Sequence, residues 1–204
     1  MIRTLIADDH AVVRIGLSAL LGTESDIEVV GVAKDGEEAV AETLRLRPDV
    51  IVMDLMMPKK TGVEATAEIL SALPETKIIV LTTFSASDAI ARALELGAAG
   101  AVMKTAEDAE LVSIIRTVAA GGRVISDEIK VLLAEDPPAE KLTPRQMEIL
   151  ESVTRGLTNA DIAKQFGLRE QSVKEHMSSI FAKIGAANRS EAVAITLRKQ
   201  LLKI

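Results

Sequence analysis

The stretch VIVMDLMMPKKTG, residues 50–62, decides the fold of this chain. It opens with a short run of β-branched and apolar residues, reaches one acidic residue, Asp54, and is then broken by Pro58 and Gly62. A short apolar run bounded by turn residues is consistent with a buried strand of a parallel sheet. A carboxylate where such a strand ends is unusually polar, and it makes this stretch a candidate for function as well as for structure.

Similar apolar runs lie on both sides of this stretch, and segments with helical periodicity separate them. Parallel strands need crossover connections, so five strand-then-helix units predict an α/β fold with helices on both faces of a five-stranded parallel sheet. The predicted strands are residues 4–7, 28–32, 50–53, 78–81 and 101–103, and the predicted helices are residues 12–21, 37–46, 63–73, 89–96 and 108–120.

Charged and hydroxyl side chains stand at the carboxyl ends of four of these runs. The first run ends in Asp8 and Asp9, the third in Asp54, the fourth in Thr82 and the fifth in Lys104. Each residue alone is compatible with a helix cap, a turn or an exposed position. Ligands of parallel α/β sheets bind beyond the carboxyl ends of the strands, so we expect these side chains to meet at one edge.

That combination of side chains predicts a chemistry. Three carboxylates that meet repel one another unless a cation neutralises them. Oxygen ligands favour Mg²⁺, which one or two carboxylates, waters and a phosphate typically hold. Lys104 adds a positive charge for a phosphoryl group and Thr82 adds a hydrogen-bond donor. The pattern favours phosphoryl transfer onto a carboxylate, with Asp54 as the nucleophile.

Charge divides the chain into an acidic and a basic part. Residues 1–120 hold 11 basic and 19 acidic residues, whereas residues 141–204 hold 11 basic and 6 acidic ones. This asymmetry suggests that only the basic part meets a polyanion. Residues 121–140 are predicted to form a linker, because Pro137-Pro138 favours an extended chain; a short helix over residues 126–133 lies within it.

The basic part is helical throughout. Thr143 followed by Pro144 is a helix start, and Thr158 with Asp161 three residues later resembles a capping box. Gly167 ends a short helix and the next begins almost at once, which is the pattern of a helix-turn-helix. The predicted helices cover residues 144–155, 159–166, 170–184 and 190–202.

The third of these helices has two faces. One is an apolar stripe suited to a core, formed by Val173, Met177, Ile180, Phe181 and Ile184. The other mixes long polar with small residues, which suits a helix in the major groove of DNA, although a solvated face is the simpler alternative. It consists of Gln171, Lys174, Glu175, Ser178 and Ala182.

Composition excludes several classes of function. The chain has no cysteine, hence no disulfide, thiolate zinc site or cysteine nucleophile. It has no Trp or Tyr, which argues against a stacking platform for single-stranded nucleic acid, and its two histidines, His10 and His176, are far apart in sequence. No apolar run reaches the roughly 18 residues of a membrane span, and MIRTLIADDH becomes acidic too early for a signal peptide. We expect a cytoplasmic protein with no membrane partner.

Residues 1–120 resemble the receiver domain of two-component response regulators. The resemblance rests on the acidic pair Asp8-Asp9, on DLMMPKKTG at residues 54–62, on Thr82 and on Lys104 after GAAGAVM. It implies a doubly wound, flavodoxin-like domain that a histidine kinase phosphorylates. It further implies Asp54 as the phosphoacceptor, a Mg²⁺ site of Asp8 (through water), Asp9, Asp54 and the Met56 carbonyl, Thr82 as the switch hydroxyl, Lys104 as the phosphate partner, and Pro58 and Gly62 as shapers of the loop.

Three positions bear on how such a domain would work. Ala101 stands where many receivers carry an aromatic residue that changes rotamer, so Thr82 and the following loop must signal in another way. Met56 and Phe84 flank the approach of water to a phosphorylated Asp54 by family geometry. Because both are bulky and apolar, we expect slow self-dephosphorylation.

Residues 142–193, LTPRQMEILESVTRGLTNADIAKQFGLREQSVKEHMSSIFAKIGAANRSEAV, resemble a LuxR/NarL-type helix-turn-helix domain. The resemblance implies a small all-α domain of four helices, the third reading DNA and the fourth forming a dimer contact. Together the two resemblances indicate a NarL/FixJ-type response regulator that binds promoter DNA as a homodimer on activation, with RNA polymerase as a candidate partner. Lys174, Glu175 and Ser178 would reach base edges, and Thr158, Arg169, Gln171 and Lys183 would be phosphate contacts.

Two other functions compete with this one. A magnesium-dependent hydrolase with Asp54 as nucleophile would resemble the haloacid dehalogenase family, but those enzymes usually carry a second aspartate two residues later, where Met56 stands. A regulator that never needs phosphate would not require the acid pair, Thr82 and Lys104. We therefore expect a regulator rather than an enzyme.

Overall fold

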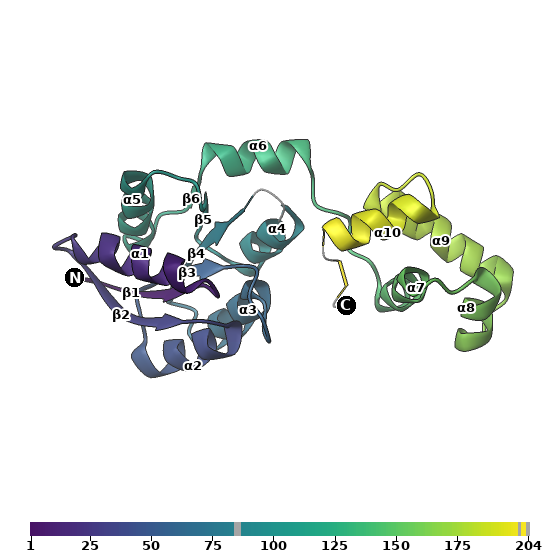
Figure 1. Cartoon of the computed structure of the whole chain (residues 1–204), viewed down its shortest axis with the longest axis horizontal. Coiled ribbons are helices and arrows are strands. Elements are labelled where there is room, and N and C mark those ends of the chain that lie inside the picture. The colour runs from purple at the N-terminus through teal and green to yellow at the C-terminus, as the bar shows by residue number, and fades with distance from the viewer. Residues whose placement is uncertain (84–86, 200, 203–204) are drawn as a thin grey trace. The chain divides into compact units, whose positions relative to one another are not determined.

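The computed structural model describes residues 1–83, 87–199 and 201–202, and the chain divides into two compact units, residues 1–137 and 138–204 (Figure 1). Within the described residues, no helix combines the length and the apolar character needed to cross a membrane.

The first unit is a parallel sheet of six strands in the order β2-β1-β3-β4-β5-β6. Five of the strands follow the predicted runs closely, which confirms the α/β fold with a doubly wound sheet. The strands are β1 (Ile2–Ala7), β2 (Ile27–Ala33), β3 (Val50–Asp54), β4 (Lys77–Thr82), β5 (Gly100–Met103) and β6 (Val124–Ile125), and the helices are α1 (Ala11–Gly22), α2 (Gly36–Leu46), α3 (Gly62–Ala72), α4 (Ser87–Leu96), α5 (Asp108–Ala119) and α6 (Asp127–Glu135).

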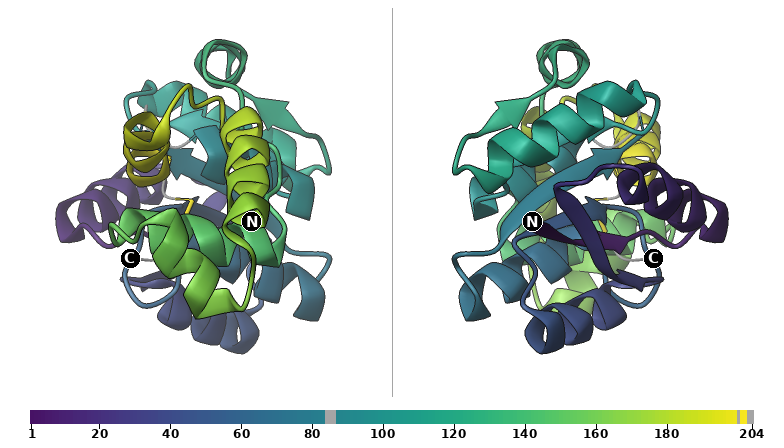
Figure 2. Two further views of the ribbon diagram at one scale, coloured as in Figure 1. Left: turned by 90° about the vertical axis from the view of Figure 1, so that its right-hand side faces the viewer. Right: turned by 90° about the vertical axis from the view of Figure 1, so that its left-hand side faces the viewer.

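Helices cover both faces of the sheet, α1 and α5 on one side and α2, α3 and α4 on the other (Figures 1 and 2). Alternation along the strands explains the two layers: Ile51 and Met53 of β3 enter the core beneath α2, α3 and α4, while Val50 and Val52 enter the core beneath α1 and α5. Strands buried on both faces are apolar at nearly every position, which is why they appear in the sequence as continuous runs.

The sixth strand, β6, is a feature that the sequence did not predict. It has two residues, too few for any periodicity, and it exists because β5 offers an edge with which it can pair: the N–H of Val124 donates to the carbonyl of Ala99 at 3.0 Å. Helix α6 follows, with Ser126 as its N-cap, as predicted, and with Ile129 fully buried. Both elements fall inside the predicted linker, residues 121–140, but they belong to the first unit, where β6 pairs with β5 and α6 packs against β5 and α4.

The second unit contains α7 (Pro144–Thr154), α8 (Asn159–Phe166), α9 (Glu170–Ile184) and α10 (Arg189–Arg198). Both predicted starts are confirmed, since Thr143 and Thr158 each form a capping box. Gly167 adopts φ 64°, a left-handed conformation that favours glycine, and so lets α9 begin directly after α8. The predicted stripe of α9 fills the core of this unit, with Val173 and Ile180 fully buried.

Candidate functional site

The register of the sheet places the predicted residues in one row. Asp54 comes directly after the β3 partner of Ala7, and Asp8 comes directly after Ala7 itself. In the same way Lys104 comes directly after the β5 partner of Thr82, and its backbone N–H donates to the Thr82 carbonyl at 2.7 Å. Four strands thus deliver one polar residue each to the same edge.

Lys104 bridges two buried carboxylates at this edge. Its Nζ lies 2.6 Å from Asp8 Oδ2 and 2.8 Å from Asp54 Oδ2, and these side chains are 1% and 3% exposed. The other oxygen of Asp54 accepts a hydrogen bond from the Met56 N–H at 3.2 Å. Burial raises the pKa of Asp54 above its usual value, against the effect of these two donors. Burial would lower the pKa of Lys104, but its two carboxylate partners raise it overall, which favours the ammonium form.

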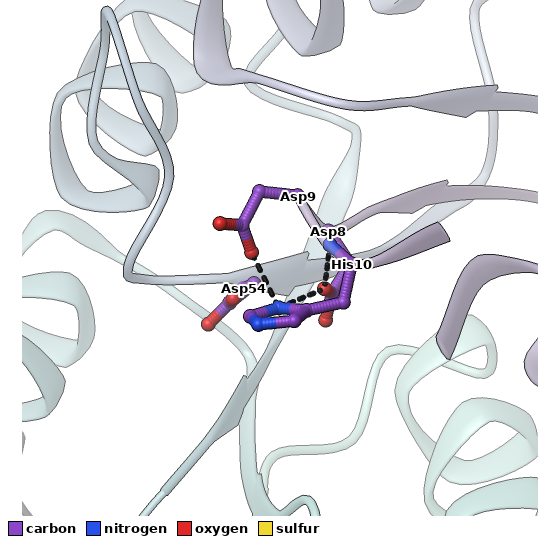
Figure 3. A group of neighbouring side chains, drawn as sticks. All are labelled: Asp8, Asp9, His10 and Asp54. Carbon is purple, nitrogen blue, oxygen red and sulfur yellow. Dashed lines mark hydrogen bonds and ion pairs between the residues drawn. The ribbon is translucent and has the colours of Figure 1, made fainter. Parts of the chain in front are cut away.

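The turn after β1 completes the cluster (Figure 3). The N–H of His10 donates to Asp8 Oδ1 at 2.8 Å, and the ring Nδ1 of His10 lies 2.6 Å from Asp9 Oδ1 and 3.2 Å from Asp8 Oδ1. One ligand atom from each of these three residues and one from Asp54 lie within 4.8 Å of one another. The structure therefore brings together the three carboxylates that the sequence selected, and it adds an imidazole.

The loop after β3 is folded tightly against Asp54. A Cβ on Gly62 would meet the Asp54 carbonyl oxygen at 2.0 Å, so only glycine fits there, and the Gly62 N–H donates to the Leu55 carbonyl at 3.0 Å. Lys59 adopts φ 62° in this loop, and its Nζ lies 2.6 Å from Asp35 at the start of α2. These contacts hold the loop in place, and the Met56 N–H within it contacts Asp54.

Four residues bear on switching and on water access: Thr82, Ala101, Met56 and Phe84. Thr82 is fully buried, and its hydroxyl donates to its neighbour's carbonyl at a long 3.3 Å. Ala101 is fully buried in β5, beside the core of the sheet. Met56 is half-buried next to the acceptor, whereas Phe84 lies outside the described residues.

In the second unit, α9 presents the predicted polar face to solvent. Gln171, Lys174, Glu175 and Ser178 are all exposed, while Val173 between them is buried. Exposed Thr158 and Arg169 stand at the N-termini of α8 and α9. Two contacts of this polar face are long: Lys174 Nζ lies 3.5 Å from Glu170, and Gln171 donates to Glu175 at 3.4 Å.

Sequence reasoning missed two residues that hold these sites in shape. Arg14 of α1 donates to the backbone carbonyl of Asp8 at 2.7 Å and so stabilises the turn after β1. No local sequence pattern predicts this contact. Gln146 of α7 is buried, donates to Ser179 at 3.0 Å and accepts from Lys183 at 3.1 Å. A glutamine three residues after Thr143 completes a capping box, and that spacing was the available signal. The side chain of Lys183, predicted as a phosphate contact, thus donates to a residue of its own unit in this structure.

Comparison with known proteins agrees with this division of the chain. Residues 4–116 match the response regulator receiver domain family, and residues 140–196 match the luxR family of bacterial regulatory proteins. Both families are those of regulatory proteins.

Individual proteins match over nearly the whole chain. The response regulator protein VraR of Staphylococcus aureus is 37% identical over 207 residues, which covers 99% of both chains. The crystal structure of response regulator ChrA from a heme-sensing two-component system is 32% identical, with a TM-score of 0.61 over 98% of both chains. RcsB from Salmonella enterica serovar Typhimurium, solved bound to a promoter in the presence of phosphomimetic BeF3⁻, is 24% identical and shares the fold, with a TM-score of 0.73 over 97% of this chain and 98% of that one.

The residues at the sheet edge, the helix-turn-helix that follows, and the matches to both parts of the chain lead to one conclusion. This chain belongs to the two-component response regulators that join a receiver domain to a LuxR-type DNA-binding domain.

Proposed function

We propose that a histidine kinase phosphorylates this protein on Asp54 in a Mg²⁺-dependent reaction, and that the phosphorylated chain binds promoter DNA as a dimer to regulate transcription. The observation that carries the proposal is the environment of Asp54. Its buried carboxylate lies between the Lys104 ammonium and the Met56 N–H, within a group of two further carboxylates. Such a site supports a nucleophile and the charge that develops on a transferred phosphoryl group.

In the proposed reaction, an oxygen of Asp54 attacks the phosphorus of the kinase's phosphohistidine. The new P–O bond forms while the P–N bond breaks, and the electron pair of the P–N bond returns to the imidazole nitrogen. Lys104 is already 2.8 Å from the acceptor carboxylate, so its ammonium can stay beside the phosphoryl oxygens. Positioning and electrostatic stabilisation are the main contributions a protein makes to this kind of transfer.

The residues around Asp54 fit a divalent cation. Asp9, Asp54 and the backbone carbonyl of Met56 would be its ligands, with Asp8 acting through water, and these oxygen donors are the kind that Mg²⁺ prefers. Bound Mg²⁺ supplies positive charge that neutralises the carboxylates and the phosphoryl oxygens. Within the acidic pair, Asp8 is the buried residue and accepts from the His10 N–H, whereas Asp9 is partly exposed, which supports the indirect role of Asp8.

Thr82 is the proposed switch. Its hydroxyl makes only a 3.3 Å hydrogen bond in this structure, so little is lost when it turns to a phosphoryl oxygen on Asp54. With alanine at position 101 there is no aromatic ring to follow this movement. The signal would pass instead through the segment after β4 to α4, where the Ser87 hydroxyl donates to Asp136, just after α6, at 2.7 Å.

DNA recognition is proposed for the exposed face of α9. Lys174, Glu175 and Ser178 would reach base edges in the major groove. Helix α10 would form the dimer contact, and RNA polymerase is a candidate partner on the promoter. The exposed residues Thr158, Arg169 and Gln171 would contact phosphates, as would Lys183 once it is released from Gln146 and from the Lys141 carbonyl.

The proposal is tested by phosphate incorporation from a radiolabelled acyl phosphate. The parent protein should incorporate phosphate with Mg²⁺ and not with excess EDTA, and Asp54→Asn should incorporate none while keeping the circular dichroism spectrum of the parent. Asp127→Asn is a matched control, because Asp127 is 93% exposed on α6, and it should incorporate as much as the parent. Equal incorporation by Asp54→Asn would overturn the acceptor assignment.

A further inference from the structure

Residues 123–136, the β6–α6 segment, are hydrogen-bonded to α4 at both ends of that helix (Figure 1). At the first residue of α4, the buried Ser87 hydroxyl donates to Asp136, the C-cap residue of α6, at 2.7 Å. At the other end of α4, the guanidinium of Arg123 donates to the Ala98 carbonyl at 3.1 Å and to the Leu94 carbonyl at 3.4 Å. The β6–α6 segment therefore spans α4 from one end to the other.

Apolar packing joins the same segment to α4 and β5 between these two ends. Ile129 of α6 is fully buried, and it belongs to the core that contains Ile90 of α4 and Ala101 of β5. Helix α6 contacts both α4 and β5, and the N–H of Ser126 donates to the Ala101 carbonyl at 3.0 Å. Because a close-packed core transmits strain, a shift of α4 would either move the β6–α6 segment or break its contacts.

The chain that follows Asp136 reaches the recognition helix within a few residues. Pro137 and Pro138 favour an extended, semi-rigid chain, so a movement of Asp136 is not lost in a flexible linker. Within the second unit, the Glu140 N–H donates to the carbonyl of Lys183, in the last turn of α9, at 3.0 Å. The segment bonded to α4 thus leads directly to a backbone contact with the helix proposed to read DNA.

We propose that the β6–α6 segment transmits the phosphorylation state of Asp54 from α4 to α9, and that the hydrogen bond between Ser87 and Asp136 couples the segment to α4. This inference rests on the proposed function and names the route of its regulation. Thr82, the proposed switch, ends β4, and α4 is the next element along the chain. A change at Thr82 therefore reaches the first residue of α4, and with it the bond to Asp136.

The test measures the DNA affinity of the whole chain by fluorescence anisotropy, with and without phosphorylation by an acyl phosphate and Mg²⁺. The DNA is a site that the parent protein selects from random sequences. The readout is the activation ratio, the factor by which phosphorylation changes the affinity. Ser87→Ala should lower this ratio roughly 2–10-fold, which is what the net contribution of one hydrogen bond corresponds to. Phosphate incorporation should match that of the parent.

Two further variants show whether this one bond is responsible. Asp136→Ala should also lower the activation ratio, and adding Ser87→Ala to it should lower the ratio no further, because the bond is already lost. Ser113→Ala, in which an exposed serine of α5 is replaced, is the matched control and should keep the parental ratio. A parental ratio in Ser87→Ala and in Asp136→Ala would overturn the inference, because the signal would then bypass the β6–α6 segment.

Hydrogen–deuterium exchange of backbone amides gives a readout that does not depend on DNA. In the parent, phosphorylation should change the exchange of α4 and of α6 together, and in Ser87→Ala the response of α6 should decrease while that of α4 remains. A response confined to α4 in the parent would also overturn the inference. A parent that takes up no phosphate, or whose DNA affinity ignores it, would contradict the proposed function and this inference with it, so the two failures are distinguishable.

Discussion

At the scale of single residues, Asp8 and Asp9 are neighbours with different surroundings. Asp8 is buried and paired with Lys104, whereas the side chain of Asp9 is 32% exposed at the opening of the cluster. Of the two, Asp9 is the carboxylate that a cation can reach from solvent, because Asp8 is enclosed by the protein. The acidic pair therefore divides into one residue that faces the protein and one that faces solvent at the proposed cation site.

This division predicts the effect of two substitutions on Mg²⁺ affinity. Asp9→Asn should weaken Mg²⁺ binding on the order of tenfold or more, because Asp9 is the proposed direct ligand, and Asp8→Asn should weaken it less. A calorimetric Mg²⁺ titration of both variants and the parent measures the difference. If Asp8→Asn proved the more damaging, the assignment of Asp9 as the direct ligand would be wrong.

Met56 leads to a prediction about the lifetime of the phosphorylated state. Hydrolysis needs a water in line with the P–O bond, and an apolar side chain two residues after the acceptor cannot orient one. Met56→Asn should therefore speed the decay on the order of tenfold, less than the roughly 10²–10⁴-fold that a full general acid or base contributes. Decay is followed after donor removal at fixed Mg²⁺, and Met56→Leu, which stays apolar, should decay as the parent does. Decay of Met56→Asn at the parental rate would show that this side chain does not exclude the water.

At the scale of elements, one ion pair joins the start of α2 to the loop after β3. Asp35 accepts from the Glu38 N–H at 2.9 Å, which caps α2, and pairs with Lys59 in the loop that holds Asp54. The hydrogen bond from Lys59, with help from the cap, lowers the pKa of Asp35 below its usual value of 3.8. The ionised carboxylate thus stabilises the fold, and that contribution is present above the unfolded pKa and lost as the pH falls through the lowered folded pKa.

Asp35→Asn should reveal this contribution. Lys59 is largely exposed, so the variant should lose about 1 kcal/mol or less of the free energy of unfolding at neutral pH. The gap between variant and parent should begin to close as the pH falls below about 4, where the carboxyl of the unfolded parent becomes protonated, and should vanish below the lowered pKa of the folded state. Urea unfolding at several pH values measures it, and Lys59→Gln should show the same trend. A gap that is independent of pH would mean that the charge of Asp35 does not matter.

At the scale of the whole molecule, two units with separate cores carry separate tasks. The core of the second unit consists entirely of residues from its own helices and their flanking segments, among them Ile149, Val173 and Ile195. The acidic and basic halves of the sequence coincide with these units, so DNA affinity is expected to reside in the second.

Lys174→Ala in the whole chain tests how the second unit reads DNA. If Lys174 contacts a base, its loss should cost about 1–3 kcal/mol of binding free energy on the preferred site and relax the preference at one position. Competition binding on a series of single-base variants measures both effects, and Lys130→Ala on exposed α6 is the charge-matched control. A uniform loss on every sequence, with a shallower salt dependence, would instead make Lys174 a phosphate contact.

Much of this molecule follows from its sequence alone. The runs around residues 50–53 and 78–81, the caps at Thr143 and Thr158 and the left-handed Gly167 are recognisable because each depends on residues within one strand, one turn or one helix end. The polar strand ends were also predictable, because every parallel strand of one sheet delivers its last residue to the same edge.

Tertiary structure alone decided the contacts between distant segments. Three such contacts depend on strand register and helix packing. They are the ion pairs of Lys104 with Asp8 and Asp54, the pairing of β6 with the edge of β5, and the hydrogen bond from Lys183 to Gln146. No local pattern encodes those contacts, because they are set by which side chains the completed core leaves facing one another. The sequence thus determined which residues reach the functional edge, and the packed sheet determined how they touch.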